Sequence, residues 1–494
     1  MLDYRKTVHA VVFALFYVAN AFAMEEVKIP AELRNLSYGI YPDSAEYNTA
    51  RLNYNKRFQY FPKAIFAPTN HDEIRHVFSV LKRHHLRFAI RSGKHCLEPG
   101  SLSSDYIIDL SKFNAIRPDY DHDKVYIGAG AQLGRVIAKL GETNHAIPTG
   151  TCPTVGVSGL ALGGGIGLLC RQKGLTCDAV ESITMLNADG EVINIDETHY
   201  HNLFWALRGG GNGSYGIVLG WNFNVSCIPE ASFYELMWEY SPELIAPIID
   251  AWQEWVATLS TDITSVLAIR HPNHFCADPE NSPPTVIRIF GLKIGSEPFT
   301  EWQTAFSELN PQVKVFTGGY GELSQYWAKE SDLPFVKSKS RILMEPIQQN
   351  TIDLITEFFN KLDTKNPNYL IYFELEAFGG AMRDTHTAFF PRDAFAWWYQ
   401  AYYWPEQVQS PEVLALANEF YAKIPSNVSE YCYSNIVDYD LGKSYLHRYY
   451  GDHVDRLVRT KKRNDPTNLF HWHQSIPLTL PHTEGDSDEP VDNQ

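Results

Sequence analysis

The sequence predicts an α+β protein of two domains, and two observations carry this prediction. Between residues 61 and about 225, short β-type runs alternate with helical stretches, and glycine-rich turns bound them. Between residues 233 and about 399, glycines are fewer, the amphipathic helices are longer, and the strands alternate exposed and buried positions. A chain of 494 residues has room for two or three domains, so we expect the second domain to begin near residue 228.

The individual elements follow from the period of the hydrophobic residues. The predicted helices are residues 71–84, 133–140, 243–259 and 351–362. The predicted strands are residues 106–110, 125–127, 285–292 and 369–378. The last two strands alternate polar and apolar side chains, which predicts a sheet with one face turned toward water or a site.

The beginning of the chain has the pattern of an export signal. Two basic residues precede an apolar run at residues 10–19, and Ala21-Phe22-Ala23 follows it. This order is typical of a signal peptide cleaved after Ala23, so we expect a periplasmic or extracellular protein. An uncleaved anchor is the alternative, although the run is shorter than the roughly 20 residues of a membrane span. Residues 481–494 carry five acidic residues and predict a solvated tail.

Composition and charge exclude several classes of function. The formal net charge of −16 repels a phosphate backbone, so no nucleic-acid partner is expected. Hydrophobic residues at 44% and aromatic residues at 13% exclude a largely disordered chain. The chain contains no Cys-x-x-Cys pair and no convincing histidine spacing for zinc, so no metal site is predicted.

Three glycine clusters lie in the first half of the chain, at residues 91–95, 150–167 and 209–213. Glycine has no Cβ, so a backbone that contains it can approach a ligand closely and direct its N–H groups at phosphates. Each cluster alone also fits a set of tight turns. The run GLALGGGIG at residues 159–167 satisfies a loose G-x-G-x-x-G pattern, but it does not follow a strand and does not by itself indicate NAD.

The order of these clusters is more specific than any one of them. RSGKH, GTCPTVGVSGLALGGGIG and LRGGGNGSYGIV follow one another at intervals of about 55 residues, and the C-terminal segment contains YYG, DPTNLF and QSIP. With this motif set, residues 61–477 resemble the berberine-bridge-enzyme-like branch of the FAD-linked oxidases. The resemblance implies a flavin domain of the vanillyl-alcohol-oxidase or PCMH type, made of two α/β subdomains, and an α+β substrate domain with an antiparallel sheet. The implied division is a signal peptide at 1–23, a FAD-binding domain at 24–227, a substrate domain at 228–445, a C-terminal segment that completes the FAD domain at 446–480, and a tail at 481–494.

The same resemblance implies two covalent bonds to FAD. In the family, a histidine of Arg-Ser-Gly-Gly-His is bonded to the flavin 8-methyl group, and a cysteine of Gly-x-Cys-Pro-Thr-Val-Gly is bonded to ring carbon six. These positions map onto His95 and Cys152, and a flavin bond at Cys152 accounts for one of an odd total of seven cysteines. Lys94 stands where the family usually has glycine, and its cation either stabilises the reduced flavin or points to solvent. The residues that the resemblance places at the flavin are Arg91, Ser92, Gly93, Lys94, His95, Gly150, Cys152, Val155, Gly156, Gly159, Gly163, Gly164, Gly165, Gly167, Gly216, Ile217 and Asn468.

Removal of hydride from an alcohol carbon needs a base for the hydroxyl proton. In the predicted strand 369–378, Tyr372, Glu374 and Glu376 are two residues apart and share one face. Such a stripe is either solvent surface or a lined site, and the resemblance, in which this strand covers the flavin, favours the site. Two close carboxyls disfavour double ionisation, so one of them is expected to have a raised pKa that suits proton transfer.

The tyrosine that carries the base in many relatives is absent from this sequence. Those relatives have Tyr-x-Asn-Tyr-x-Asp, whereas residues 433–438 read YSNIVD, with Ile436 at the position of the second tyrosine. Either another residue has become the base or the chemistry has changed. The aromatic run at residues 397–404 lines a sugar site or packs the core of a sheet. The candidate catalytic residues are Glu376, Glu374, Tyr433 and Tyr402.

The sequence therefore predicts an exported flavoenzyme that takes hydride from a small-molecule alcohol, most specifically a carbohydrate hydroxyl. In the plant branch of the family that the chain resembles, a small valine at the position of Val155 goes with oxygen access. This resemblance favours oxygen as electron acceptor and hydrogen peroxide as product. A dehydrogenase that uses a quinone or another carrier is the alternative acceptor chemistry. Oxidation of an alkaloid-like secondary metabolite is the rival reaction, and a flavin-containing binding protein without turnover is the rival outside enzymes. Stable membrane insertion is not expected.

Overall fold

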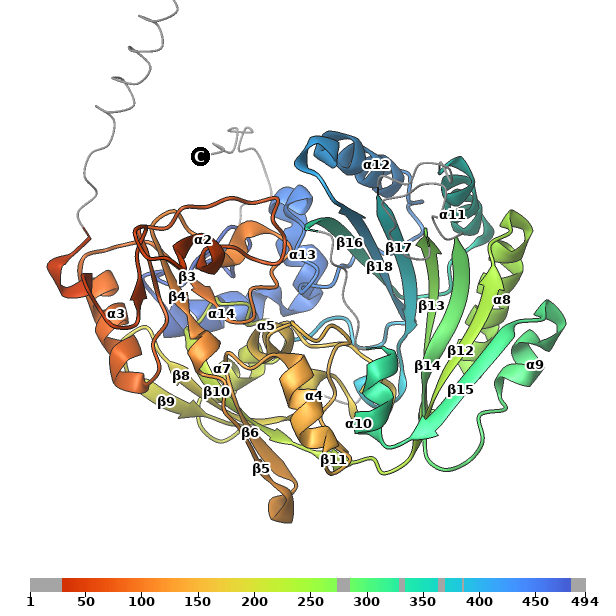
Figure 1. The fold of residues 1–494 in the computed structure, drawn as a ribbon, viewed down its shortest axis with the longest axis horizontal. Coiled ribbons are helices and arrows are strands. Elements are labelled where there is room, and N and C mark those ends of the chain that lie inside the picture. Colours follow the sequence, from red (N-terminus) through yellow and green to blue (C-terminus); the bar gives the residue numbers. More distant parts are fainter. Residues whose placement is uncertain (1–28, 273–284, 328–333, 363–368, 384–385, 481–494) are drawn as a thin grey trace, which may run out of the picture.

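The computed structural model describes residues 29–272, 285–327, 334–362, 369–383 and 386–480, which form two lobes (Figure 1). The predicted signal peptide and the predicted acidic tail lie outside the described residues. The first lobe holds two small sheets with their helices, and the second holds one broad sheet with helices on its outer face. The mixed architecture confirms the predicted α+β fold.

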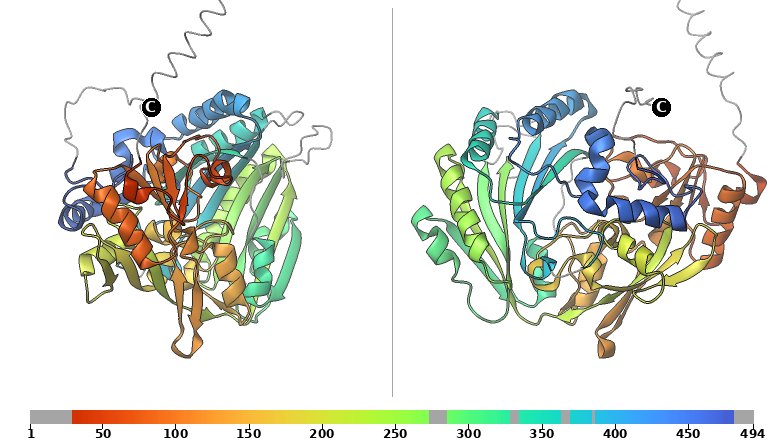
Figure 2. Two further views of the ribbon diagram at one scale, coloured as in Figure 1. Left: turned by 60° about the vertical axis from the view of Figure 1, so that its left-hand side comes forward. Right: turned by 180° about the vertical axis from the view of Figure 1, so that it is seen from behind.

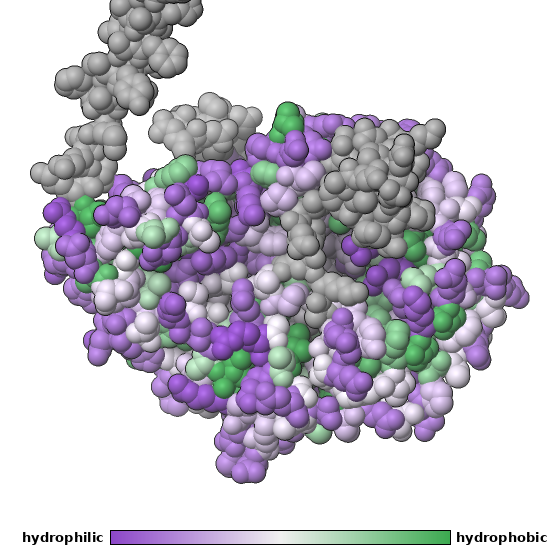
Figure 3. Space-filling view, in the orientation of Figure 1, coloured by the Kyte–Doolittle hydropathy of each residue, from purple (hydrophilic) through white to green (hydrophobic). Residues whose placement is uncertain are grey.

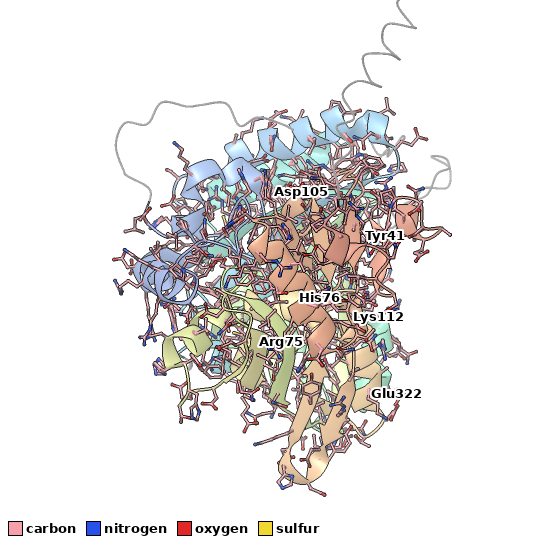
Figure 4. All side chains as sticks on the ribbon, turned by 90° about the vertical axis from the view of Figure 1, so that its left-hand side faces the viewer. Tyr41, Arg75, His76, Asp105, Lys112 and Glu322 are labelled. Atoms are coloured by element: carbon pink, nitrogen blue, oxygen red, sulfur yellow. The ribbon has the colours of Figure 1, made fainter. Side chains whose placement is uncertain are left out.

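The first sheet of the first lobe has four strands in the order β1-β2-β4-β3. Its strands are β1 (Gly39–Ile40), β2 (Ala64–Phe66), β3 (Phe88–Arg91) and β4 (Tyr106–Asp109). Helix α3 (His71–Arg83) is capped by Asn70, whose side chain accepts hydrogen bonds from the backbone N–H groups of Asp72 and Glu73. Its apolar face, which includes Phe78, is buried, whereas Arg75 and His76 point away from the sheet (Figure 4). β3 ends at Arg91, so this sheet delivers the RSGKH turn.

The second sheet of this lobe has five strands in the order β5-β6-β10-β8-β9. Its strands are β5 (Ile116–Asp119), β6 (Lys124–Gly128), β8 (Val180–Leu186), β9 (Val192–Ile195) and β10 (Ile217–Asn224). A further pair of short strands is formed by β7 (His145–Ala146) and β11 (Ser226–Cys227). The helices of the segment are α2 (Tyr47–Ala50), α4 (Leu133–Gly141), α5 (Val157–Leu162), α6 (Cys170–Lys173) and α7 (His201–Leu207).

The second lobe is a seven-stranded sheet in the order β15-β12-β14-β13-β17-β18-β16, with every neighbouring pair antiparallel. Its strands are β12 (Ala231–Glu239), β13 (Ile263–His271), β14 (Val286–Ile294), β15 (Gln312–Gly318), β16 (Phe335–Leu343), β17 (Leu370–Ala377) and β18 (Ala396–Trp404). Its helices are α8 (Pro242–Thr258), α9 (Trp302–Phe306), α10 (Tyr320–Leu323), α11 (Gln349–Lys361) and α12 (Ser410–Ala422).

The outer face of this sheet packs against α8, α9, α11 and α12, as Figures 1 and 2 show. Large apolar side chains from both layers, such as Trp252, Phe373 and Trp398, form the core between them. The opposite face turns toward the first lobe (Figure 1). Because alternate strand residues point to opposite faces, every second residue of each strand is available to line the space between the lobes.

The end of the chain returns to the first lobe as α13 (Tyr445–Tyr450) and α14 (Val454–Asn464) (Figure 2). Phe470 stacks on Phe78 of α3 with ring centroids 5.6 Å apart. The fully buried Lys461 donates to Asp465 at 2.7 Å and to the backbone oxygen of Ser214 at 2.6 Å. These contacts bind the C-terminal segment to the glycine-rich segment near residue 213.

The outer surface in the view of Figure 3 is mostly hydrophilic, with hydrophobic residues in small groups. Within the described residues, no helix combines the length and the apolar composition that a membrane span requires.

Candidate active site

A cavity of about 1560 Å³ lies between the two lobes. The loops that follow β3 and precede α5 line one side, and the inner face of the seven-stranded sheet lines the other. His95 and Cys152 both face this cavity, as do Glu374 and Glu376 on the opposite wall. The structure thus brings together the main residues that the sequence singled out, although they are up to about 280 positions apart.

Two glycines bring the His95 loop and the Cys152 loop into contact. A Cβ atom added to Gly93 would lie 2.2 Å from the backbone nitrogen of Gly156, and one added to Gly156 would lie 2.5 Å from the backbone nitrogen of Gly93. Both distances are far below van der Waals contact, so only glycine permits this crossing of the two backbones. Ser92 fixes the same turn, since its hydroxyl donates to the backbone oxygen of Ala129 at 2.6 Å.

The Cys152 loop is held from the other side by the start of α4. The backbone N–H of Leu133 donates to the oxygen of Val155 at 2.9 Å, and that of Gly134 donates to the oxygen of Pro153 at 2.8 Å. The backbone that follows Cys152 is therefore bound at two points to the start of α4. Its thiol lies within electrostatic range of Tyr399 and Tyr403, and it adds to the raised pKa that burial gives these two phenols.

His95 lies against an aromatic ring that the sequence did not indicate. Tyr54 stacks on the imidazole with centroids 4.1 Å apart, and its backbone N–H donates to the oxygen of Lys94 at 2.8 Å. Lys94 has a positive φ of 61°, a conformation that glycine adopts more easily. Its ammonium lies 3.5 Å from the carboxylate of Asp109. The Lys94 cation is thus partly neutralised by the protein rather than pointing freely into solvent.

Arg91 is buried in the first lobe and does not line the cavity. Its guanidinium is buried, 2.6 Å from Asp109 Oδ2, and donates to the backbone oxygen of Ala50 at 2.7 Å. Asp109 therefore bridges Arg91 and Lys94, and the two cations hold its pKa below the ordinary value despite the opposing effect of burial. The prediction that Arg91 contacts the flavin is not supported by this arrangement, because the side chain turns away from the cavity.

The predicted flavin residues divide into two groups. Those that line the cavity are Ser92, Gly93, Lys94, His95, Gly150, Cys152, Val155, Gly156, Gly159 and Gly216. Those that do not line it are Arg91, Gly163, Gly164, Gly165, Gly167, Ile217 and Asn468. Ile217 is fully buried in the core of β10, and Asn468 is a left-handed turn residue with a φ of 53°.

The glycines at 163–167 are closely packed and do not line the cavity, and their contact with the flavin stays a prediction. A Cβ at Gly163 would lie 2.1 Å from the side chain of Asn435, and one at Gly167 would lie 1.9 Å from the backbone oxygen of Thr149. Gly159 is different, because a Cβ there meets no heavy atom within 4 Å. Only Gly159 of this run therefore opens onto the space that a ligand would fill.

Glu374 and Glu376 both lie on the cavity face of β17. Burial raises the pKa of Glu374 to about 7, although a hydrogen bond with Tyr372 and the charges of Arg288 and Arg270 act in the opposite direction. Burial, and then the charge of Glu374, raise the pKa of Glu376 to about 8. The expected raised pKa thus occurs at both carboxyls, and Glu376 is the more strongly shifted.

The neighbouring strand places aromatic residues beside these carboxyls. In the register of β17 and β18, Glu374 pairs with Tyr399 and Glu376 pairs with Trp397. Both aromatic side chains line the cavity, and so does Tyr403. Aromatic rings and carboxyls therefore share one wall, opposite the loops that carry His95 and Cys152.

Tyr402 lies on the other face of β18, which corrects its prediction as a catalytic residue. Its fully buried ring packs edge-on against Phe358 of α11, with centroids 6.4 Å apart. The hydroxyl has no hydrogen-bond partner among the described residues. The two-residue alternation of the strand was correctly inferred, but Tyr402 belongs to the half of the run that forms the core.

Tyr433 lines the cavity, with a hydroxyl that is held by two donors. The backbone N–H of Gly165 and the side-chain N–H of Asn435 each donate to it at 2.8 Å. Burial nevertheless keeps its pKa above the ordinary value, so the phenol is protonated at neutral pH and suits hydrogen-bond donation better than proton abstraction. Ile436 lines the cavity close by and supplies only an apolar surface.

Salt bridges fix the His95 loop to the sheet. Lys337 of β16 donates to Glu98 at 2.9 Å and to Asp438 at 2.6 Å, and all three side chains are buried. Asn55 adds hydrogen bonds to the backbone oxygens of Leu97 and Val336. Because these contacts cross from one lobe to the other, they set the distance between the two walls of the cavity.

Sequence reasoning missed several side chains of the cavity wall, among them Tyr54, Arg270 and Arg288. Tyr54 lies in an irregular segment without a periodic signal. Arg270 and Arg288 each interrupt an apolar strand, and a charged residue within such a strand is a signal that could have been used.

The cavity fits a flavin nucleotide. Glycine turns form one side, with open space above Gly159, and the cavity extends past Phe88 and Phe470 to the polar edge near Ser103. A histidine and a cysteine line the loop wall, and two carboxyls of raised pKa line the opposite wall. The fold and the site together define the class of FAD-linked oxidoreductases.

Comparisons with known proteins agree with this class. Residues 62–196 match the family model described as FAD binding domain, and residues 432–477 match the one described as berberine and berberine like. An uncharacterized FAD-linked oxidoreductase, YgaK of Bacillus subtilis, is 29% identical over 453 residues, which cover 88% of this chain and 95% of the relative. These matches support a berberine-bridge-enzyme-like FAD-linked oxidoreductase with a PCMH-type fold.

Two solved structures illustrate the fold. A chitooligosaccharide oxidase matches with a TM-score of 0.77 and 21% identity, covering 89% of this chain and 96% of its own. A variant of berberine bridge enzyme in complex with (S)-reticuline matches with a TM-score of 0.80 and 23% identity, covering 90% of this chain and 96% of its own. At these identities the likeness concerns the fold, while the substrate depends on the side chains of the cavity.

Proposed function

We propose that this protein is an exported oxidase that removes hydride from an alcohol carbon, specifically a carbohydrate hydroxyl, and passes the electrons to oxygen. FAD is held by two covalent bonds, at His95 and at Cys152. The observation that carries this proposal is the pair of cavity-facing carboxyls, Glu374 and Glu376, opposite the His95 and Cys152 loops.

The case for the two bonds rests on position and chemistry. The imidazole and the thiol line one cavity, and the crossing of Gly93 and Gly156 brings their loops together. The stack of Tyr54 on His95 limits rotation of the imidazole. When bound, the flavin supplies the hydride acceptor, and covalent bonds raise its reduction potential, which favours weakly activated alcohols.

The protein's own contribution to the reaction is the handling of the hydroxyl proton. A carboxyl with a pKa of about 8 can accept this proton once it is ionised, because its basicity is far higher than that of an ordinary glutamate. Glu376 is the base in this proposal, and its pKa is raised first by burial and then by the charge of Glu374. Tyr433 positions the hydroxyl as a hydrogen-bond donor, while Ile436 leaves the usual tyrosine position apolar.

The carbohydrate assignment is supported by the aromatic residues of the wall. Trp397, Tyr399 and Tyr403 flank the carboxyls, and such rings pack against the apolar faces of sugars while nearby polar groups bind the hydroxyls. The similar fold of a chitooligosaccharide oxidase is in line with this assignment. Val155 lines the cavity three residues after Cys152, and its small side chain is the basis for oxygen as acceptor.

A second reaction is favoured by a different part of the cavity. Phe233, Phe290 and Phe316 line it beyond the carboxyls, and Ile436 adds a further apolar surface. An aromatic secondary metabolite fits such a lining, and a berberine bridge enzyme complex with (S)-reticuline has the same fold. Parallel assays with sugars and with aromatic alcohols distinguish the two reactions.

The first experiment is to express the chain without residues 1–23, precipitate it in acid, and measure the absorbance and intact mass of the washed pellet. A yellow pellet heavier by one FAD is expected. His95→Ala should keep the flavin through Cys152, whereas replacement of both residues should release it. A double variant that retains flavin in acid would refute the attachment. Peroxide release on addition of sugars then tests the oxidase, and reduction of the flavin without peroxide would indicate another acceptor.

A further inference from the structure

Two arginines lie side by side on the sheet wall of the cavity, beyond the two glutamates. Arg270 belongs to β13 and Arg288 belongs to the adjacent β14. In the register of these strands Arg288 pairs with Ala268, and Arg270 is two residues further along the same strand. Both side chains therefore share one face of the sheet as diagonal neighbours, within reach of a common ligand.

The hydrogen-bonding groups of this pair are incompletely used by the protein. The Nε atoms of Arg270 and Arg288 are buried and have no hydrogen-bond partner among the described residues. Arg288 has one carboxylate neighbour, Glu235, at 3.4 Å. Arg270 has no carboxylate within 4.0 Å in the part of the chain that the structure describes. A guanidinium without an anionic partner in a cavity wall is costly unless a ligand supplies that partner.

Aromatic rings hold the two guanidinium groups in place. The Arg270 guanidinium lies 5.1 Å from the ring centroid of Tyr372, and that of Arg288 lies 4.1 Å from the centroid of Phe290. Stacking on a ring leaves the edge of the planar fork free to donate in parallel to two oxygens. The arrangement thus fits a planar or tetrahedral oxyanion better than it fits a neutral hydroxyl.

The charge balance of the wall also favours an anion. Arg270, Arg288 and Lys314 contribute three cations to this part of the cavity, where Glu235 is the carboxylate that pairs with Arg288. Burial raises the pKa of Glu374 and of Glu376, so these two carboxyls offset the positive charge less than ordinary glutamates would. Lys314 is exposed, so its contribution is screened by salt more than that of the arginines.

The sheet register gives the span between the reaction centre and this pair. Tyr399, next to Cys152, pairs with Glu374; Glu374 pairs with Ala268; and Ala268 pairs with Arg288. Glu374 and Arg288 are therefore two strand spacings apart, about 10 Å. A span of this size corresponds to two sugar rings laid along the wall.

We propose that Arg270 and Arg288 form an anion subsite, and that the substrate is an acidic saccharide whose carboxylate or phosphate group binds there while a hydroxyl of another ring is oxidised. This inference rests on the proposed function for the identity of the reacting group. The anion gives the pair its missing acceptors, and its position selects the ring that reaches Glu376.

Three disaccharides that differ at one carbon test the subsite: cellobiose, cellobiouronic acid, in which the outer CH₂OH is a carboxylate, and cellobiose 6′-phosphate. Binding to the flavin-containing protein is measured by the ligand-dependent shift of the unfolding temperature and by calorimetry. We expect one or both acidic disaccharides to bind about 10- to 100-fold more tightly than cellobiose, as for other charge-assisted hydrogen bonds. The preferred acid distinguishes a carboxylate ligand from a phosphate ligand. Equal binding of all three sugars would overturn the proposal.

Single replacements assign the preference to the pair. Arg270→Gln and Arg288→Gln should each reduce the affinity for the acidic sugar and leave that for cellobiose unchanged. Arg270→Lys keeps the charge without the planar fork and should recover only part of the affinity. Arg117→Gln, on the exposed β5, is the matched control and should change nothing. An equal loss for neutral and acidic sugars would show that the arginines act only through the pKa of Glu374 or through folding, and would overturn the subsite.

Flavin reduction, followed separately under anaerobic conditions, keeps the two proposals apart. If the acidic sugar binds through Arg270 and no sugar reduces the flavin, the subsite stands and the proposed oxidase fails. If cellobiose and the acidic sugars reduce the flavin with equal rates and affinities, the oxidase stands and the subsite fails.

Discussion

The two walls of the cavity are built on different principles. On the loop wall, the backbone sets the geometry, since Gly93 and Gly156 cross at a distance that excludes any side chain. On the sheet wall, side chains set the geometry, because Glu374, Ala268 and Arg288 come from three strands and meet only through their register. The first wall is therefore encoded in short continuous motifs, and the second is encoded in residues of separate strands, between 20 and 106 positions apart.

This difference predicts different responses to mutation. A change on the loop wall should disturb the fold and the flavin together, because the two loops have no room to move. A change on the sheet wall should leave the fold largely intact and alter proton transfer or substrate choice, since the functional side chains of this wall line the cavity. The predictions below test this contrast, beginning with the largest expected effect.

Gly93→Ala should abolish flavin incorporation. The added methyl group would lie 2.2 Å from the backbone of Gly156, so the crossing of the two loops must open. The flavin content per protein, taken from the ratio of absorbance at the flavin band to that of the protein, measures this loss. Gly159→Ala is the contrast, because its methyl group meets no heavy atom within 4 Å and should leave the unfolding temperature unchanged. A folded Gly93→Ala protein with full flavin content would contradict the backbone-defined loop wall.

Glu376→Gln should slow flavin reduction by about 10²–10⁴-fold while the flavin content stays unchanged. Because the pKa of Glu376 is raised to about 8, the base is protonated at low pH. The rate of the unmodified enzyme should therefore rise up to tenfold per pH unit below about 7 and level off above about 8, and the variant should lack this rise. Rapid-mixing measurements under anaerobic conditions follow both effects.

The control for this prediction is Glu357→Gln, the same chemical change at an exposed carboxylate of α11. It should retain the rate and its pH profile. A Glu376→Gln enzyme with an unchanged pH profile would transfer the role of base to another group, of which Glu374, with a pKa of about 7, is the nearest candidate.

Much of the fold is predictable from the sequence because the hydrophobic periods are strong. The helix expected at 243–259 is α8 (Pro242–Thr258), and the strand expected at 369–378 is β17 (Leu370–Ala377). The resemblance to a family also led to His95 and Cys152, since both lie in loops that short motifs define. Their presence on one cavity is seen in the structure, while their bonds to FAD stay a prediction.

The sheet wall was less predictable for physical reasons. Alternation shows that Trp397, Tyr399 and Tyr403 share a face opposite to Tyr402. Aromatic residues suit either face of a sheet, so the sequence did not show which face lines the cavity, and Tyr402 of the core face was predicted as catalytic. Arg270 and Arg288 are neighbours only because β13 and β14 pair in the sheet, and no local sequence pattern shows which strands pair. The glycines at 163–167 look alike in sequence, although some are required because neighbouring side chains such as Asn435 leave no room for a Cβ atom.

The raised pKa of Glu376 should also appear as a pH-dependent stability. The folded-state pKa of about 8 lies above the ordinary value of 4.5, so the folded protein binds a proton that the unfolded chain releases within this window. Stability is then fully present below about pH 4.5 and falls as the pH rises toward 8, by about 5 kcal/mol. Glu376→Gln should raise the unfolding temperature of the flavin-containing protein at pH 8.5 and change it little at pH 5. An equal effect at both values would contradict the buried, protonated carboxyl.

Two tyrosines on opposite faces of the same lobe give the smallest and most selective test. Tyr433→Phe leaves the N–H groups of Gly165 and Asn435 without their acceptor, so the free energy of unfolding should fall by about 1–3 kcal/mol. Tyr402→Phe removes a buried hydroxyl that has no partner among the described residues, so stability should stay constant or rise slightly, and the rate of flavin reduction should stay within about twofold. Thermal unfolding and anaerobic reduction measure both. The two changes are chemically identical, so their effects can be compared directly. A large loss of rate in Tyr402→Phe alone would place this residue back at the reaction centre. An unchanged rate in Tyr402→Phe supports the division of β18 into a core face and a cavity face.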